Sequence, residues 1–263
     1  MQKISPPRPA AGMPRRRLCL AADVEQYSRL DTPTQSAVQS ELVWMLDEAA
    51  ELTGLDRAAW TRQPQGDLEF AVLPEATPED AVLGPFIHHL AVRLGDRNAR
   101  PAAQRIRLRM AVDTGVVEDA ALGHAGPAPV AVARYVNAPQ LRAVLATLNT
   151  ADLAVIVSDR LYQDVVRSGL PDLDPAQYAR AHVRMKEFGG YGWIRVPGQA
   201  PDEVRSALAD APEPKPSPDI AAPSQTNLSQ YVHQGAAVGR DVVGGLTFGP
   251  PVPPPSTGLG TTR

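Results

Sequence analysis

The chain has 263 residues and a formal net charge of −3, from 26 basic and 29 acidic side chains. This balance gives no overall positive field, so we expect neither nucleic acid nor an anionic membrane surface as a partner. Hydrophobic residues make up 43% of the chain and aromatic residues only 5%, so aliphatic side chains must fill the core. The length allows one domain of ordinary size with extensions.

The cysteine content and the hydropathy indicate the cellular compartment. Cys19 is the only cysteine of the sequence, so no intramolecular disulfide can form. No apolar stretch of the sequence approaches the roughly 20 residues that a membrane-spanning helix needs. Residues 1–14 are proline-rich and lack the apolar centre of a signal peptide. We therefore expect a cytoplasmic protein.

Composition divides the chain into five zones. Residues 1–14 form a lead that we expect to be disordered, and residues 15–198 alternate strand and helix patterns as a folded domain does. Residues 199–225 are rich in Pro, Ala and acidic residues, which is typical of a linker with polyproline II character. A Gln/Gly/Val segment follows at 226–249, and residues 250–263 form a tail that we expect to be disordered.

The folded zone begins with a strand and a helix. The apolar run over 17–22 predicts a buried strand that ends at Asp23. Thr32 followed by Pro33 is typical of a helix N-cap and first turn, and Gly54 of a helix end. Between these signals, apolar side chains recur at helical spacing and are expected on one face: Val38, Leu42, Met45, Leu46, Ala49 and Leu52.

Two strands and a second helix follow. Gly66 and Asp67 form a turn that enters a strand over 68–73, and the pattern over 77–94 predicts a helix. The segment 105–112 alternates strictly, with apolar side chains on one face and arginines between them. Such alternation is typical of a half-buried strand, with the arginines on the solvent side.

The last part of the zone predicts a helix over 130–148, a buried strand over 153–157 and a short helix over 160–166. A final hairpin is expected from strands at 182–186 and 191–196, joined across Gly189 and Gly190. This order of elements predicts an α+β fold with a ferredoxin-like core. We expect a central, mainly antiparallel sheet with helices on one face.

Two carboxylates stand at the ends of predicted strands. Asp23 follows the first strand, and Asp67 lies in the turn that enters the next one. Adjacent antiparallel strands would bring both side chains to one edge of the sheet. Two carboxylates near each other suit Mg²⁺, which completes its shell with substrate phosphates. Each Asp taken alone is more often a helix cap or a turn residue.

Several segments resemble the motifs of class III adenylate and guanylate cyclases, in a divergent, actinobacterial form. The sequence ADVEQYSRL at 22–30 is similar to the first metal motif of that family, and QGDLEFAV at 65–72 to the second. MAVDTGV at 110–116 and GPAPVAVAR at 126–134 are similar to later strand and helix motifs. Two further strand segments match, at 155–159 and 183–186. The resemblance extends over 17–198 and depends on the order of the motifs.

The resemblance implies a site and a reaction. Asp23 and Asp67 would hold Mg²⁺ or Mn²⁺, and Arg134 would stabilise charge on the transferring phosphorus of a nucleoside triphosphate. Gln63 stands where the family contacts the base, and Lys186 would reach the triphosphate. Members of the family act as head-to-tail homodimers with composite sites, so these residues would come from two chains. The alternatives without a functional role are that Arg134 faces solvent on its helix and that Lys186 is a charge at the edge of a strand.

The sequence also departs from the family pattern at the substrate-reading positions. Gln63 replaces the usual Lys or Glu, and Gly123 stands where the family has its partner Asp. Val130 replaces the Asn that orients the ribose, and valine cannot form that hydrogen bond. Losing both contacts should weaken positioning of the transition state. The sequence thus leaves open an active cyclase with cyclic nucleotide synthesis, an inactive dimerisation or sensor module, and a plain ligand-binding domain without the site.

The segment 226–249 differs from the rest of the chain. Val, Gln and Gly recur at short spacing with few charges and no proline, which is typical of cross-β segments. The pattern resembles short amyloid-forming motifs of bacterial signalling proteins, which recruit an effector protein by templated strand pairing. The alternative is a disordered Gly-rich tail in which the valine pattern arose by chance.

Overall fold

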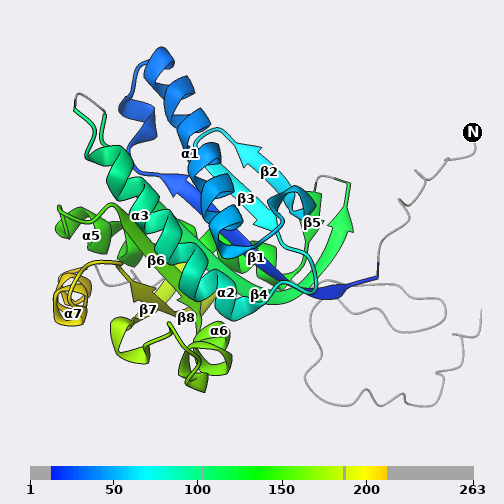
Figure 1. Cartoon of the computed structure of the whole chain (residues 1–263). Helices are drawn as coiled ribbons and strands as arrows, with labels where there is room; N and C mark the ends of the chain where they lie inside the picture. Colours follow the sequence, from blue (N-terminus) through cyan, green and yellow to red (C-terminus); the bar gives the residue numbers. More distant parts are fainter. Residues whose placement is uncertain (1–12, 102–103, 122, 186–187, 212–263) are drawn as a thin grey trace, which may run out of the picture. The chain divides into compact units, whose positions relative to one another are not determined.

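The structure, a computed structural model, describes residues 13–101, 104–121, 123–185 and 188–211 (Figure 1). The strands are β1 (Arg15–Val24), β2 (Thr61–Gln65), β3 (Leu68–Val72), β4 (Leu108–Ala120), β5 (Gly123–Ala125), β6 (Leu153–Ser158), β7 (Ala179–Met185) and β8 (Phe188–Arg195). The helices are α1 (Thr32–Thr53), α2 (Glu79–Ala81), α3 (Ile87–Asn98), α4 (Pro127–Val136), α5 (Pro139–Thr147), α6 (Asp159–Asp164) and α7 (Pro201–Ala209).

One mixed sheet organises the part of the chain that the structure describes. Its strand order is β2-β3-β1-β4-β6-β8-β7, and β5 pairs with β4 beside this path. Neighbouring strands run antiparallel except for β4 and β6, which are parallel. The prediction of an α+β fold around a mainly antiparallel sheet is confirmed.

Helices cover both faces of the sheet, so the prediction of helices on one face is wrong. Along β1, Leu18 and Leu20 pack into a core with α1 and α3, which lie together over one face (Figure 1). Cys19 and Ala21 point the other way, into a second core with α4, α5 and α7. A strand buried on both faces is continuously apolar, which explains the unbroken hydrophobic run at this position.

Helix α1 matches the prediction except at two residues. Asp31, not Thr32, is the N-cap, because its side chain accepts a hydrogen bond of 3.0 Å from the backbone N–H of Thr34. Leu52 is 49% exposed and lies off the buried face. Gly54 ends the helix with a φ of 76°, as expected from the sequence.

Prolines divide two of the predicted helices. The helix expected over 77–94 is interrupted by a π-helical segment at Val82–Phe86 that contains Pro85. The helix expected over 130–148 is two helices, α4 and α5, because Pro139 begins the second one. Conversely, Pro201 begins α7 inside the zone expected to be a linker, and Val204 and Ala207 of α7 are buried in the second core.

The terminal hairpin and one edge strand also differ from prediction. Gly189 and Gly190 do not form the turn of the hairpin, since they lie in β8 and pair with Arg184 and Val183 of β7. Strand β2 was not expected, because its sequence is polar and contains Pro64. Proline is tolerated in an edge strand, which is the place that β2 takes in the sheet.

Some predictions concern residues outside the described part of the chain. Lys186 and the segment 226–249 are among them, as are residues 212–225 of the proposed linker and the tail at 250–263. Their roles stay predictions. Among the residues that the structure describes, no helix has both the length and the apolar character needed to cross a membrane.

Candidate functional site

Asp23 lies near the end of β1, where the sheet brings it opposite a cation. The strand register pairs Asp23 with Arg109 of β4 on one side and with Leu68 of β3 on the other. The Arg109 guanidinium donates to Oδ2 of Asp23, and both side chains are about 10% exposed. Asp23 is therefore a buried carboxylate held by an ion pair, not a solvent-facing turn residue.

Asp67 is half-buried in the turn between β2 and β3. The backbone N–H of Val24 donates to the carbonyl oxygen of Asp67 over 3.1 Å, which fastens this turn to the end of β1. The two carboxylates are close enough for the charge of Asp67 to raise the pKa of Asp23. The turn that carries Asp67 thus lies beside the end of β1 that carries Asp23, and a cation shared by the two side chains stays a prediction.

Burial and neighbouring charges shift the pKa values of Asp23 and Arg109. Burial raises the pKa of Asp23 from 3.8 to about 6, an effect that Arg109 opposes and Asp67 increases. Burial also lowers the pKa of Arg109, while Asp23 acts in the opposite direction. Both shifts have the same cause, since each charge has been removed from water. At neutral pH Asp23 carries its charge, but less firmly than an exposed aspartate.

The donor atoms suit a magnesium or manganese ion. Carboxylate oxygens are the ligands that Mg²⁺ prefers, and it commonly takes only one or two of them together with substrate phosphates. Over the described ranges, no group of three or more His, Cys, Asp or Glu side chains could hold a metal ion. Asp23 and Asp67 supply at most two carboxylates, and Arg109 already pairs with Asp23, so a cation here would need phosphate oxygens for its remaining ligands.

Two arginines of this region were missed in the sequence. Arg109 was expected on the solvent side of a half-buried strand, but it is 8% exposed and its Nε has no hydrogen-bond partner within the described structure. Arg142 of α5 is exposed, and its charge acts on the pKa of both Asp23 and Arg109. We call the group Asp23, Asp67, Arg109 and Arg142 the carboxylate end of the site.

A second group lies where β2, β5 and α4 meet. Gly123 of β5 has a φ of 117°, and a Cβ atom at this position would lie 1.6 Å from Nε2 of Gln63 on β2. The Gln63 side chain thus occupies the space that a side chain at residue 123 would need. The structure brings these two positions together, as the resemblance implies. We call Gln63, Gly123, His124 and Val130 the β5 corner.

Helix α4 carries the remaining predicted side chains. Val130 is 53% exposed, and Arg134 follows it one turn later and is half-buried. In the described structure, Arg134 forms no hydrogen bond or ion pair with Asp23 or Asp67 of its own chain. The N-cap of α4 is Gly126, where φ is 128° and a Cβ atom would lie only 2.3 Å from the carbonyl oxygen of Val116. This close approach fixes the start of α4 against β4.

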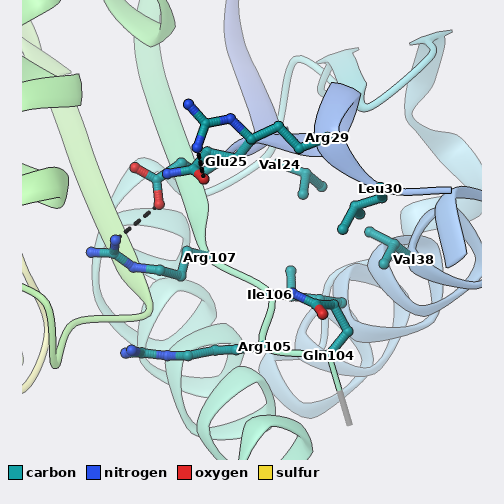
Figure 2. Close-up of a pocket in the computed structure, with 10 residues that line it drawn as sticks. Val24, Glu25, Arg29, Leu30, Val38, Gln104, Arg105, Ile106 and Arg107 are labelled. Carbon is teal, nitrogen blue, oxygen red and sulfur yellow. Dashed lines mark hydrogen bonds and ion pairs between the residues drawn. The ribbon is translucent and has the colours of Figure 1, made fainter.

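A cavity of about 410 Å³ adjoins the end of β1 (Figure 2). Apolar side chains, Val24 and Ile106 among them, form one wall, and Glu25 and Arg107 form part of the other. Arg107 pairs with Glu25 at 2.9 Å and donates to the carbonyl oxygens of Leu148 and Ala151 beyond α5. These contacts tie β1 to the connection between α5 and β6, so Arg107 has a structural role.

Comparison with known proteins defines the fold. No protein-family model and no curated protein sequence matches the chain. Among solved structures, an adenylate/guanylate cyclase/hydrolase from Silicibacter pomeroyi aligns with a TM-score of 0.51 at 20% identity, over 71% of this chain and 99% of that one. The fold is that of a nucleotide cyclase domain.

Two further cyclase structures are similar at lower scores. The guanylyl cyclase Cya2 aligns with a TM-score of 0.49 at 12% identity, over 71% of this chain and 93% of its own. The guanylate cyclase domain of RhGC from Catenaria anguillulae, in complex with GTP, aligns with a TM-score of 0.44 at 15% identity, over 69% and 95%. The alignment with the Silicibacter pomeroyi structure confirms the resemblance for the fold, whereas the roles of Asp23, Asp67, Gln63, Arg134 and Lys186 stay predictions.

Proposed function

We propose that this chain is a cyclase-like signalling domain that binds a nucleoside triphosphate together with Mg²⁺ or Mn²⁺ at the carboxylate end. The convergence of Asp23, Asp67 and the buried Arg109 at the end of β1 carries this proposal. Such a cluster of two carboxylates and two arginines is typical of a site for a cation bound to phosphates.

Different residues of the chain would bind the cation and the phosphates. Asp23 and Asp67 would hold the cation, which when bound neutralises phosphate charge and lowers the pKa of a hydroxyl group. Arg109 has an unpartnered Nε within the described structure, and Arg142 is exposed nearby, so both guanidinium groups suit phosphate oxygens. Pairing with Arg109 favours the charged form of Asp23, and burial disfavours it. A bound divalent cation would therefore further favour the charged form.

The reaction that we propose is slow ring closure of the nucleotide. The ribose 3′-oxygen forms a bond to the α-phosphorus, the bond from that phosphorus to the oxygen bridging to the β-phosphate breaks, and pyrophosphate leaves. The hydroxyl proton passes to solvent. Arg134 would stabilise the charge that develops on the phosphoryl oxygens, and Lys186 would contact the triphosphate. Because Val130 cannot hydrogen-bond to the ribose, we expect low turnover.

A homodimer would complete the site. We propose a head-to-tail arrangement in which Gln63 and Arg134 of one chain face Asp23 and Asp67 of the other. Arg134 has no ion-pair partner among the described residues of its own chain, which agrees with a role across an interface. Helix α4 packs against β1 and β4, which lie at the centre of the sheet (Figure 1), so both ends of the site are carried by the same sheet.

Product analysis tests the catalytic part of this proposal. The full chain would be incubated with each of the four common nucleoside triphosphates and MnCl₂, and the nucleotides separated by chromatography. We expect a cyclic nucleotide and pyrophosphate in equal amounts from at least one substrate. Asp67→Asn should abolish the product, and Asp96→Asn, an exposed carboxylate on α3, should not. No product from any of the four would contradict cyclisation.

A second function is favoured by exposed apolar side chains beside α4. Val116 and Val130 are 45% and 53% exposed. These residues suit a nucleotide-independent dimer that positions the segment 226–249 to recruit an effector protein. This candidate predicts a dimer in sedimentation without nucleotide, disrupted by Val116→Asp, and thioflavin-positive fibres from a peptide of residues 226–249. A peptide that stays monomeric at high concentration would contradict the recruiting role.

A further inference from the structure

His124 in β5 is buried without the hydrogen bonds that a buried imidazole normally makes. Its side chain is 6% exposed. Nδ1 lies 3.2 Å from Oδ1 of Asp119 but forms no hydrogen bond, and Nε2 has no partner within the described residues. A buried polar atom without a partner is costly, so such atoms in folded proteins usually serve a ligand or an unseen water.

The imidazole lines a cavity of about 160 Å³. The cavity lies between the β2–β3 ribbon, β5 and α4, and its polar lining comes from Gln63, Gln65, His124 and Asn137. Phe70, which is 7% exposed, supplies an apolar wall, and its ring centroid lies 6.3 Å from that of His124. A cavity of about 150 Å³ accommodates one aromatic ring of benzene size.

These features favour one kind of ligand. A flat ring fits beside Phe70, and a hydrogen-bonding edge would meet the imidazole and the Gln63 amide. Gly123 has no side chain, and the space above it is taken by Gln63, so no acidic group from that position reaches the cavity. The ligand edge would therefore be read by neutral donors and acceptors.

We propose that His124 is a specificity-determining residue that reads the base of the bound nucleotide through Nε2, with Gln63 as its neighbour. This inference depends on the proposed binding of a nucleoside triphosphate. In a chain with Gly123 at the acidic position, the next residue of β5 would then supply the hydrogen bond that distinguishes bases. Gln63 contacts the same edge of the base.

Calorimetric titration of the full chain tests this role. ATP, GTP, CTP, UTP and inorganic tripolyphosphate would each be titrated in MnCl₂ into wild type, His124→Phe and His124→Gln. His124→Phe keeps a flat ring without nitrogen atoms, whereas His124→Gln keeps a hydrogen-bonding group. We expect His124→Phe to weaken the best nucleotide about tenfold, as the loss of one good hydrogen bond does. His124→Gln should lose less, and the affinity for tripolyphosphate should not change.

The control is His88→Ala, because His88 is exposed on α3 and does not line the cavity beside His124. Thermal melting of each variant checks that it is folded. If wild type binds nucleotides and His124→Phe keeps the same ratio of affinities among the four bases, the role of His124 is wrong and the proposed function stands. If wild type binds none of the five probes, the proposed function is wrong and the role of His124 falls with it.

Discussion

The carboxylate end and the β5 corner lie on one sheet but have diverged to different degrees from the cyclase pattern. At the carboxylate end, Asp23 and Asp67 are both present, the turn of Asp67 lies beside the end of β1, and the buried Arg109 pairs with Asp23. At the β5 corner, Gln63 and Gly123 replace the residues that the pattern requires. Gln63 and Gly123 nevertheless pack closely, because the Gln63 side chain fills the space above Gly123.

Under the proposed function, this contrast predicts which contacts to a nucleotide the chain would keep. Contacts to phosphates and a cation would depend on the charges of Asp23, Asp67 and Arg109, which are present in the chain. Recognition of the base and the ribose depends on particular hydrogen bonds, and Val130 has lost one of them. We therefore propose a nucleotide-binding domain whose base preference and turnover differ from those of typical cyclases.

The largest effect on stability is expected at the start of α4. In Gly126→Ala, the new Cβ atom would lie 2.3 Å from the carbonyl oxygen of Val116 at a φ of 128°, so both overlap and backbone strain oppose folding. We expect the free energy of unfolding to fall by about 4 kcal/mol. Gly54→Ala is the matched control, because its φ is 76° but no atom lies within 4 Å.

Gly54→Ala should therefore be destabilised by backbone strain alone, which lowers the free energy of unfolding by about 1 to 2 kcal/mol. Chemical denaturation of the full chain measures both variants. Equal losses at the two glycines would show that α4 is not held against β4 in the way that the structure describes.

Removal of the buried Arg109 guanidinium should have the next largest effect on stability, and the size of this effect should depend on pH. Arg109→Leu leaves the Asp23 carboxylate buried without its partner, which costs about 3 kcal/mol when the carboxylate is charged. At pH 5 Asp23 binds a proton and the loss should shrink. Denaturation at pH 5 and pH 8 measures the difference, and a loss that is equal at both pH values would contradict a buried ion pair.

The pKa of Asp23 predicts a pH dependence of stability with a definite sign. The pKa is about 6 in the folded chain and 3.8 in the unfolded reference, so the charged form is disfavoured by folding. Wild type should therefore lose stability relative to Asp23→Asn as the pH rises from about 4 to 6. The difference should reach about 2 to 3 kcal/mol above pH 6. A difference in stability between wild type and Asp23→Asn that stays constant between pH 4 and pH 7 would contradict the raised pKa.

The smallest effect concerns the fit of Gln63 over Gly123. Gly123→Ala should destabilise the chain both by its φ of 117° and by overlap with the Gln63 amide. In a Gln63→Ala background only the strain remains, so the double-mutant cycle should show a coupling of about 1 kcal/mol. Additive losses would mean that the two residues do not share this space.

Much of the fold could be predicted because the apolar patterns are strong. The strand that ends at Asp23, helix α1 and the buried strand β6 all follow from continuous or periodic hydrophobic residues. The patterns could not show that β1 is buried on both faces, since alternation is lost when both sides are apolar. Strand β2 escaped prediction because its residues are exposed, polar and interrupted by Pro64.

The candidate site was predictable at its acidic residues and less so at its basic ones. Asp23 and Asp67 mark strand ends, which are visible in the sequence. Arg109 alternates with apolar residues and was interpreted as solvent-facing, although a neighbouring strand places Asp23 opposite it. Such a pairing depends on register across 86 residues of sequence, which local patterns do not contain. The charge of Arg142 acts on Asp23 because α5 packs on the face of the sheet toward which Cys19 and Ala21 of β1 point.

The most direct test of the central claim is calorimetric titration of a nucleoside triphosphate into the full chain with and without MnCl₂. The account predicts saturable binding that requires the cation and that falls at least tenfold in Asp67→Asn. Asp96→Asn should bind as wild type does. Binding that is equally strong without the cation, or unaffected by Asp67→Asn, would contradict a phosphate and cation site at Asp23 and Asp67.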